Sequence, residues 1–151
     1  MDKIEQQISR FKKLDIWKLV GEMLREMSPT IIDMNQQQLL DGLMADGKPT
    51  PSHTGSIKSR AYVSSKIAAG IYNNAISPHW NYFNEGDFFD GFKTVLEGDG
   101  LLIESSDEKG GDWFVGSAEY NVYGLTDENL DFLIKIMIDT LLKKIRAELG
   151  Y

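Results

Sequence analysis

The stretch NEGDFFDGFKTVLEGDGLLIESSD, residues 84–107, decides the fold expected for this 151-residue chain. Two faces alternate along these residues: Phe92, Thr94 and Leu96 alternate with Lys93, Val95 and Glu97, and Leu101 and Ile103 alternate with Leu102 and Glu104. The two runs flank a Gly98-Asp99-Gly100 turn. Period-two alternation on both sides of such a turn predicts a β-hairpin.

Three phenylalanines, Phe88, Phe89 and Phe92, stand at the entry to this hairpin, after a Glu-Gly-Asp turn. Acids, glycines and aromatic rings gathered in one place first suggest a ligand site. A turn and hairpin that support a helix account for the same residues. We therefore expect residues 84–107 to act as a scaffold, with the three rings as core or interface anchors.

Long amphipathic helices are expected at both ends of the chain. In residues 2–27 apolar residues recur at three- and four-residue steps, which places them on one face of a helix that Ser28-Pro29 should end. This stripe would pack on the chain's own core or form a subunit interface; its members are Ile4, Ile8, Phe11, Leu14, Trp17, Val20, Leu24 and Met27.

The closing helix, residues 126–149, has clear start and stop signals. Thr126 can cap it, Asp127 and Glu128 suit the positive end of the helix dipole, and Gly150 can terminate it. One apolar stripe is expected to lie on a sheet or another helix; it comprises Leu130, Leu133, Ile134, Met137, Ile138, Leu141 and Ile145.

The region between the first helix and the hairpin, residues 29–83, reads as loops and short elements. We expect a β-like piece at residues 30–34, a brief helix capped by Asn35, and a turn at residues 46–49. Residues 49–59 are rich in Pro, Ser, Thr and Gly and predict a loop. A second helix is expected over residues 57–72.

Aromatic residues are concentrated just before the hairpin and just after it. Trp80, Tyr82 and Phe83 precede it, and Trp113 lies in one of two further expected strands, residues 113–115 and 119–123. Such rings could stack on a ligand, plug the gap between helices and sheet, or meet another subunit. The candidate interface residues are Trp80, Tyr82, Phe83, Phe88, Phe89 and Trp113.

Composition indicates one α+β domain, in which a small antiparallel sheet in residues 84–124 is packed by the two long helices. The net charge of −7 and pI of about 4.8 argue against sequence-independent binding to nucleic acid or to an anionic membrane. The chain has no cysteine, so disulfides and thiolate metal sites are excluded. No stretch has the pattern of a signal peptide or membrane span.

Catalytic, cofactor and metal motifs are not found in the sequence. The two histidines, His53 and His79, do not occur with a nucleophile motif or with metal-ligand spacing. Acids cluster at Glu85, Asp87 and Asp90, which in an acidic protein are mostly solvated turn residues. We expect a protein that is not an enzyme and has no cofactor.

Three segments carry a resemblance to a family. They are Gly86-Asp87-Phe88-Phe89-Asp90-Gly91-Phe92, the junction Tyr123-Gly124-Leu125-Thr126-Asp127-Glu128-Asn129, and residues 35–42 with Asp46-Gly47. Together with the order of elements, they resemble phage neck and tail-completion proteins, which join heads to tails. Glu85 stands where these proteins usually have Thr, and residues 49–83 match no part of their pattern.

The resemblance implies a phage virion structural protein that forms a ring at the head–tail junction. Its partners would be its own copies and the tail-tube, connector or portal proteins, and it would be assembled in the bacterial cytoplasm. DNA would pass through the ring without being specifically bound. The alternative is a cytoplasmic protein- or ligand-binding module, bacterial or prophage-encoded, that uses an aromatic groove.

Overall fold

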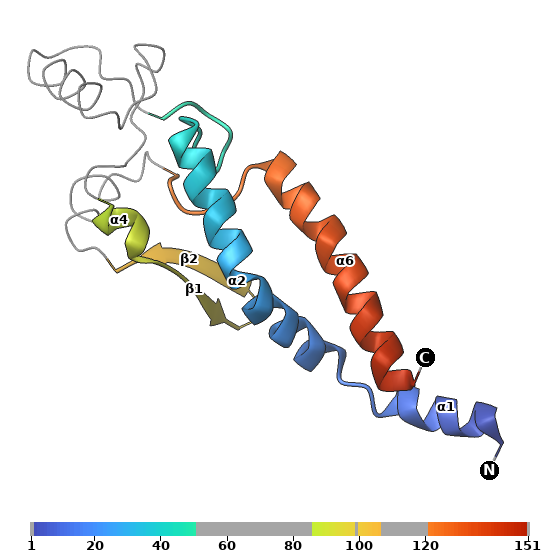
Figure 1. Cartoon of the computed structure of the whole chain (residues 1–151). Helices are drawn as coiled ribbons and strands as arrows, with labels where there is room; N and C mark the ends of the chain where they lie inside the picture. Colours follow the sequence, from blue (N-terminus) through green and yellow to red (C-terminus); the bar gives the residue numbers. More distant parts are fainter. Residues whose placement is uncertain (1, 51–85, 99, 107–120, 151) are drawn as a thin grey trace, which may run out of the picture.

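The computed structural model describes residues 2–50, 86–98, 100–106 and 121–150. Its helices and strands are α1 (Lys3–Lys12), α2 (Ile16–Leu40), α4 (Asp87–Asp90), β1 (Phe92–Glu97), β2 (Gly100–Ser105) and α6 (Asp127–Leu149) (Figure 1). The expected α+β class is confirmed, because helices at both ends accompany a two-stranded antiparallel sheet in the described residues.

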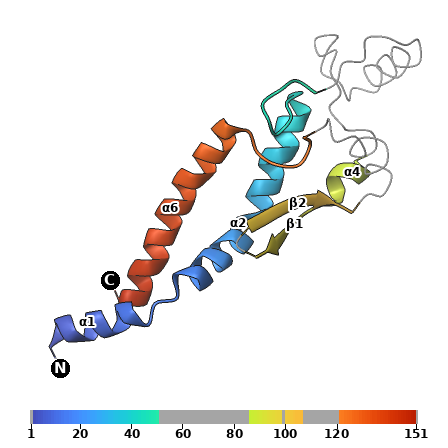
Figure 2. The same cartoon turned by 180° about the vertical axis from the view of Figure 1, so that it is seen from behind.

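The helix α2 is the central element, with the β-hairpin on one side and α6 on the other (Figures 1 and 2). It runs antiparallel to α6: Lys144, late in α6, donates to Glu26, early in α2, over 2.7 Å. Buried residues follow three- and four-residue steps along α2; the apolar ones are Leu19, Met23, Met27, Ile31 and Leu39. Burial of this kind stabilises a helix more than its intrinsic propensity does.

The single helix predicted over residues 2–27 is wrong, because the structure divides it at residues 13–15. The C-cap of α1 is Lys13, and Asp15 begins α2 by accepting a hydrogen bond from the backbone N–H of Lys18 over 3.0 Å. Asp is among the preferred N-cap residues, since its carboxylate satisfies a donor that the helix leaves unpaired. The apolar periodicity continues across residues 13–15, so the sequence pattern does not reveal the break between the two helices.

The predicted helix end at Ser28-Pro29 is also wrong, because α2 continues through Pro29 to Leu40. A proline inside a helix costs roughly 3 kcal/mol or more, since it removes one hydrogen bond and clashes with the preceding turn. Met27 and Ile31 are buried on either side of it, and each such burial contributes about 1.5–3 kcal/mol. Ser28 also shares a hydrogen bond with Thr94 of β1. Tertiary packing thus offsets the local cost.

Residues 30–34, expected to be β-like, and Asn35, expected to cap a new helix, both lie inside α2. Asn35 is fully buried. Its Nδ2 donates to the Val122 carbonyl over 3.0 Å, and its Oδ1 accepts from the Gly124 N–H over 3.3 Å. The side chain therefore binds the backbone of the segment that leads into α6.

One turn later, Gln38 extends the same network. Its Oε1 accepts from the Thr126 N–H over 2.8 Å and from Asn129 Nδ2 over 3.1 Å, and its Nε2 donates to the Gly124 carbonyl over 3.2 Å. Buried carboxamides are tolerated when their donors and acceptors are paired, as here. Together Asn35 and Gln38 determine where α6 begins.

The turn predicted at residues 46–49 is confirmed. Gly47 has φ of 74°, and Leu43 and Pro49 form an isolated antiparallel bridge around the turn. The Asp46 carboxylate accepts a hydrogen bond from the backbone N–H of Lys48 over 3.1 Å. It also forms an ion pair with the Lys48 ammonium, with 2.7 Å between Oδ2 and Nζ. This short loop contacts the segment before α6, because Ala45 N–H donates to the Asn121 carbonyl over 2.7 Å.

The predicted hairpin is confirmed, with β1 and β2 in register from the pair Phe92–Ser105 to the pair Glu97–Gly100. Gly98 has φ of 60° at the turn, a conformation that favours glycine. The face with Thr94 and Ile103 is turned toward α2, whereas Val95 and Leu102 lie on the outer face. The alternation read from the sequence therefore assigned the two faces correctly.

Two apolar clusters hold the layers together. The first joins the end of α2 to the hairpin entry and consists of Leu39, Phe88, Phe89, Phe92 and Val122. Phe88 and Phe92 meet edge to face with centroids 5.0 Å apart, an arrangement that aromatic rings prefer. The second joins α2 to α6 and consists of Met23, Met27, Ile31 and Leu133, with Leu101 and Ile103 of the hairpin packed against it.

The ends of α6 are as predicted. The hydroxyl of Thr126 accepts from the Asn129 N–H, Asp127 and Glu128 lie in the first turn, and Gly150 ends the helix with φ of 82°. The expected strand at residues 119–123 does not form in its described part, 121–123. The helix expected at residues 57–72 and the strand at 113–115 lie outside the described residues.

Replacement of Leu133 by Ala should lower the free energy of unfolding by about 2–4 kcal/mol, because it removes the buried contact of α6 with α2. Phe132→Ala is the matched control, since Phe132 is 56% exposed on the same helix; its effect should stay within about 0.5 kcal/mol. Urea unfolding followed by circular dichroism measures both. Equal losses would contradict this packing of α6.

Asn35→Ala should lower the free energy of unfolding by about 2–3 kcal/mol, because it leaves the buried Val122 carbonyl and the Gly124 N–H without their partner. Gln37→Ala, two residues on, removes only an exposed hydrogen bond to Asp41 and should change the free energy by about 0.5 kcal/mol or less. A neutral Asn35→Ala variant would show that the carboxamide does not fix the segment before α6.

Candidate functional site

The helix α1 exposes all three of its large apolar side chains. Ile4 is 62% exposed, Ile8 50% and Phe11 63%. These three residues, which we call the α1 face, lie at i, i+4 and i+7 and so form one stripe. None of the residues Lys3–Lys12 is buried. We expected the apolar stripe of residues 2–27 to pack on the core or on a subunit. Its first half, in α1, does not pack on the core.

The position of α1 is set by its polar contacts. Asp2 and Glu5 form a capping box at its start. Near its end, Arg10 Nη1 donates to the Leu149 carbonyl over 3.1 Å, so that α1 lies beside the C-terminal end of α6 (Figure 1). A cation at that place complements the negative end of the α6 dipole. Polar contacts thus hold α1 while its apolar face stays exposed.

The helix α6 carries a second exposed apolar row. Leu130 is 44% exposed, Ile134 42%, Ile138 52% and Leu142 45%. We call these four residues the α6 outer ridge; they follow steps of four and turn gradually away from the buried Leu133. The predicted stripe correctly included Leu133, Met137 and Leu141 as residues that contact α2, but it merged them with three members of this exposed ridge.

Smaller exposed apolar positions lie nearby. Trp17, just after the break before α2, is 76% exposed. On the outer face of the hairpin, Val95 pairs with Leu102 across the strands, beside an ion pair between Lys93 and Glu104 at 3.1 Å. An exposed pair of this kind is common in small sheets and carries little information by itself.

The candidate interface residues chosen from the sequence are placed differently. Phe88 and Phe89 are 6% and 7% exposed, so their rings are core side chains within this chain. Trp80, Tyr82, Phe83 and Trp113 lie outside the described residues. The exposed apolar residues of α1 and α6 were present in the sequence as stripes, and the width of the α6 stripe was a signal that α2 would not bury all of it.

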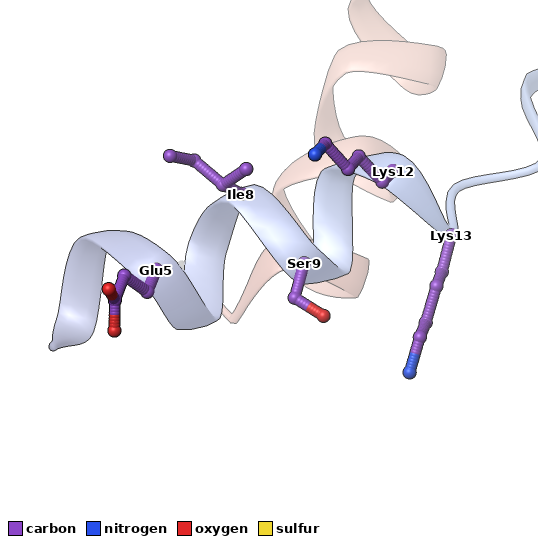
Figure 3. A pocket seen from close by; sticks show the side chains of 5 residues that line it. All are labelled: Glu5, Ile8, Ser9, Lys12 and Lys13. Atoms are coloured by element: carbon purple, nitrogen blue, oxygen red, sulfur yellow. The ribbon is translucent and has the colours of Figure 1, made fainter. Parts of the chain in front are cut away.

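The described residues offer little to hold a small ligand. An open depression runs along α1 and is lined by Glu5, Ile8, Ser9, Lys12 and Lys13. Figure 3 shows Ile8 and Lys12 projecting to one side of the ribbon and Glu5, Ser9 and Lys13 to the other. Ligand sites are concave, with polar groups that converge on one point. This depression is part of an exposed helix surface.

The ion pair between Asp46 and Lys48 shifts the pKa of both groups. The side-chain hydrogen bond from Lys48 lowers the pKa of Asp46, and the same contact raises the pKa of Lys48. In the described part of the chain, no three or more His, Cys, Asp or Glu side chains are grouped as a metal site would require. Asp46 and Lys48 therefore act as a turn-stabilising pair.

Among the helices of the described ranges, none is both long and apolar enough to cross a membrane. No family model matches the sequence, and comparison with curated proteins and with solved structures also finds no match. The α1 face and the α6 outer ridge are therefore the features from which a function must be argued.

Proposed function

We propose that this chain is a non-enzymatic structural subunit that assembles with copies of itself, as a ring in the neck or tail of a phage virion. The observation that carries self-assembly is the exposure of the α1 face and the α6 outer ridge. Contiguous exposed apolar surface on a soluble domain marks an interaction site. Two such faces on different helices suit a subunit with a neighbour on each side.

The placement in a phage rests on the resemblance of residues 86–92 and 123–129 to neck and tail-completion proteins. In the described fold these two segments lie together, because the rings of Phe88 and Tyr123 meet at a tilt with centroids 6.2 Å apart. Neighbouring partners in this proposal are tail-tube, connector or portal proteins. The net charge of −7 suits a ring that lets DNA pass without binding it.

The alternative of an aromatic binding groove would use Trp80, Tyr82, Phe83 and Trp113, which lie outside the described residues. Phe88 and Phe89 contact each other and the rest of the core. An enzymatic role through Asp87 and Asp90 is not favoured either. Asp87 and Asp90 are exposed side chains of the short helix α4. The structural role therefore remains the function that we propose.

Ile138→Lys should weaken self-association about 10-fold or more, because it places a charge in a contact that excludes water. Asp139→Ala, the adjacent residue on another face of α6, should leave association within about 2-fold of the wild type. Sedimentation equilibrium across a concentration series measures both, and circular dichroism checks that the fold is unchanged. A wild-type chain that is monomeric throughout, and absent from virions and tail tubes, would contradict the proposal.

A further inference from the structure

The two exposed apolar faces cannot cover each other within one chain. Arg10 is bonded to the C-terminal end of α6 through Leu149. At 3.6 residues per turn, Arg10 lies about 120° around α1 from the centre of the α1 face. The contact that holds α1 beside its own α6 therefore turns the face away from it. Within the described residues, therefore, neither face is covered by the chain's own elements.

The two faces match in shape. Ile4 and Ile8 of α1 are four residues apart, as are successive members of the α6 outer ridge, and rows at this spacing pack into the grooves of a facing helix. At 1.5 Å per residue, the α1 face spans about 10 Å and the ridge, from Leu130 to Leu142, about 18 Å. The ridge is therefore long enough to receive the whole face.

Charge determines the orientation of the match. Each helix has acids in its first turn and bases in its last turn: Glu5 and Arg10 with Lys12 in α1, and Asp127 and Glu128 with Arg146 in α6. Two such helices attract each other when antiparallel and repel when parallel. Beside the apolar rows, an antiparallel arrangement brings Lys12 toward Asp131 and Glu5 toward Lys135.

We propose that α1 of one copy packs antiparallel on the α6 outer ridge of a second copy. This inference rests on the self-assembly proposed above and identifies the surfaces that perform it. The α1 face and the α6 outer ridge are different surfaces, so each copy makes one contact through its α1 face and another through its α6 outer ridge. Such contacts close as a ring when the rotation between copies permits, or as a reciprocal dimer.

A membrane surface is a poorer occupant of these faces. The start of the ridge is flanked by Asp127, Glu128 and Asp131. Anionic headgroups would be repelled by these carboxylates, whereas the basic last turn of α1 complements them. A second copy therefore accounts for both the apolar match and the charge match.

Single introduced cysteines test the contact, because the chain has none of its own. Tagged Lys12→Cys and untagged Asp131→Cys chains are expressed together, purified through the tag and oxidised mildly. We expect a disulfide-linked pair of one tagged and one untagged chain. Gln6→Cys, on the opposite face of α1, replaces Lys12→Cys as the matched control and should give at least about 5-fold less product.

The outcomes separate this inference from the proposed function. Association without a Lys12→Cys to Asp131→Cys product above the Gln6→Cys control would overturn the contact and leave self-assembly standing. A specific product in a species of only two copies would support the contact and contradict the ring. A protein that stays monomeric at every concentration, and is absent from virions and tail tubes, would overturn both.

Charge exchange provides a second measurement that does not depend on disulfide chemistry. Lys12→Glu and Asp131→Lys should each weaken association about 2- to 5-fold, as expected for an exposed ion pair. The double variant should recover most of the lost affinity, because Glu at position 12 and Lys at position 131 again form a pair of opposite charges. Losses that simply add in the double variant would overturn the proposed pairing of these residues.

Discussion

The carboxamides of Asn35 and Gln38 hold the backbone of residues 122–126 against the end of α2, and the rest of the described fold depends on this contact. It fixes where α6 starts, and the antiparallel course of α6 then brings Leu133 onto Met23, Met27 and Ile31. Each hydrogen bond contributes only about 1 kcal/mol net. Leaving these buried groups unpaired would cost more, so the network specifies one placement of α6.

The same arrangement explains what the fold leaves exposed. The helix α2 is covered on two sides, by the hairpin and by α6, and its central apolar residues are buried. Among the described residues, α1 has no such layers, and its hydrogen bond to α6 lies at the end of that helix. The α6 outer ridge faces away from α2. In the described residues, the two exposed apolar rows on which the proposal rests therefore lie on α1 and α6.

The sequence allowed the hairpin, its turn and the caps of α6 to be predicted, because each depends on residues close together in the chain. It did not allow the path of α2 to be predicted. Local rules end a helix at Ser28-Pro29 and begin another at Asn35. Burial of Met27 and Ile31 outweighs the helix-ending tendency of Pro29, and the Asn35 side chain binds the distant backbone of Val122 and Gly124 instead of capping a helix. Whether the α1 face and the α6 outer ridge are exposed depends on which other elements pack against them. The periodicity of apolar residues does not contain that information.

The central claim is that α1 is stabilised by another copy rather than by its own core, and amide hydrogen exchange tests it most directly. A ten-residue helix with no buried residue is marginal on its own. Exchange at residues 6–12 should therefore slow markedly as protein concentration rises through the association range, while exchange at residues 23–39 of α2 stays constant. Exchange in α1 that is independent of concentration, in a protein that does associate, would contradict the claim.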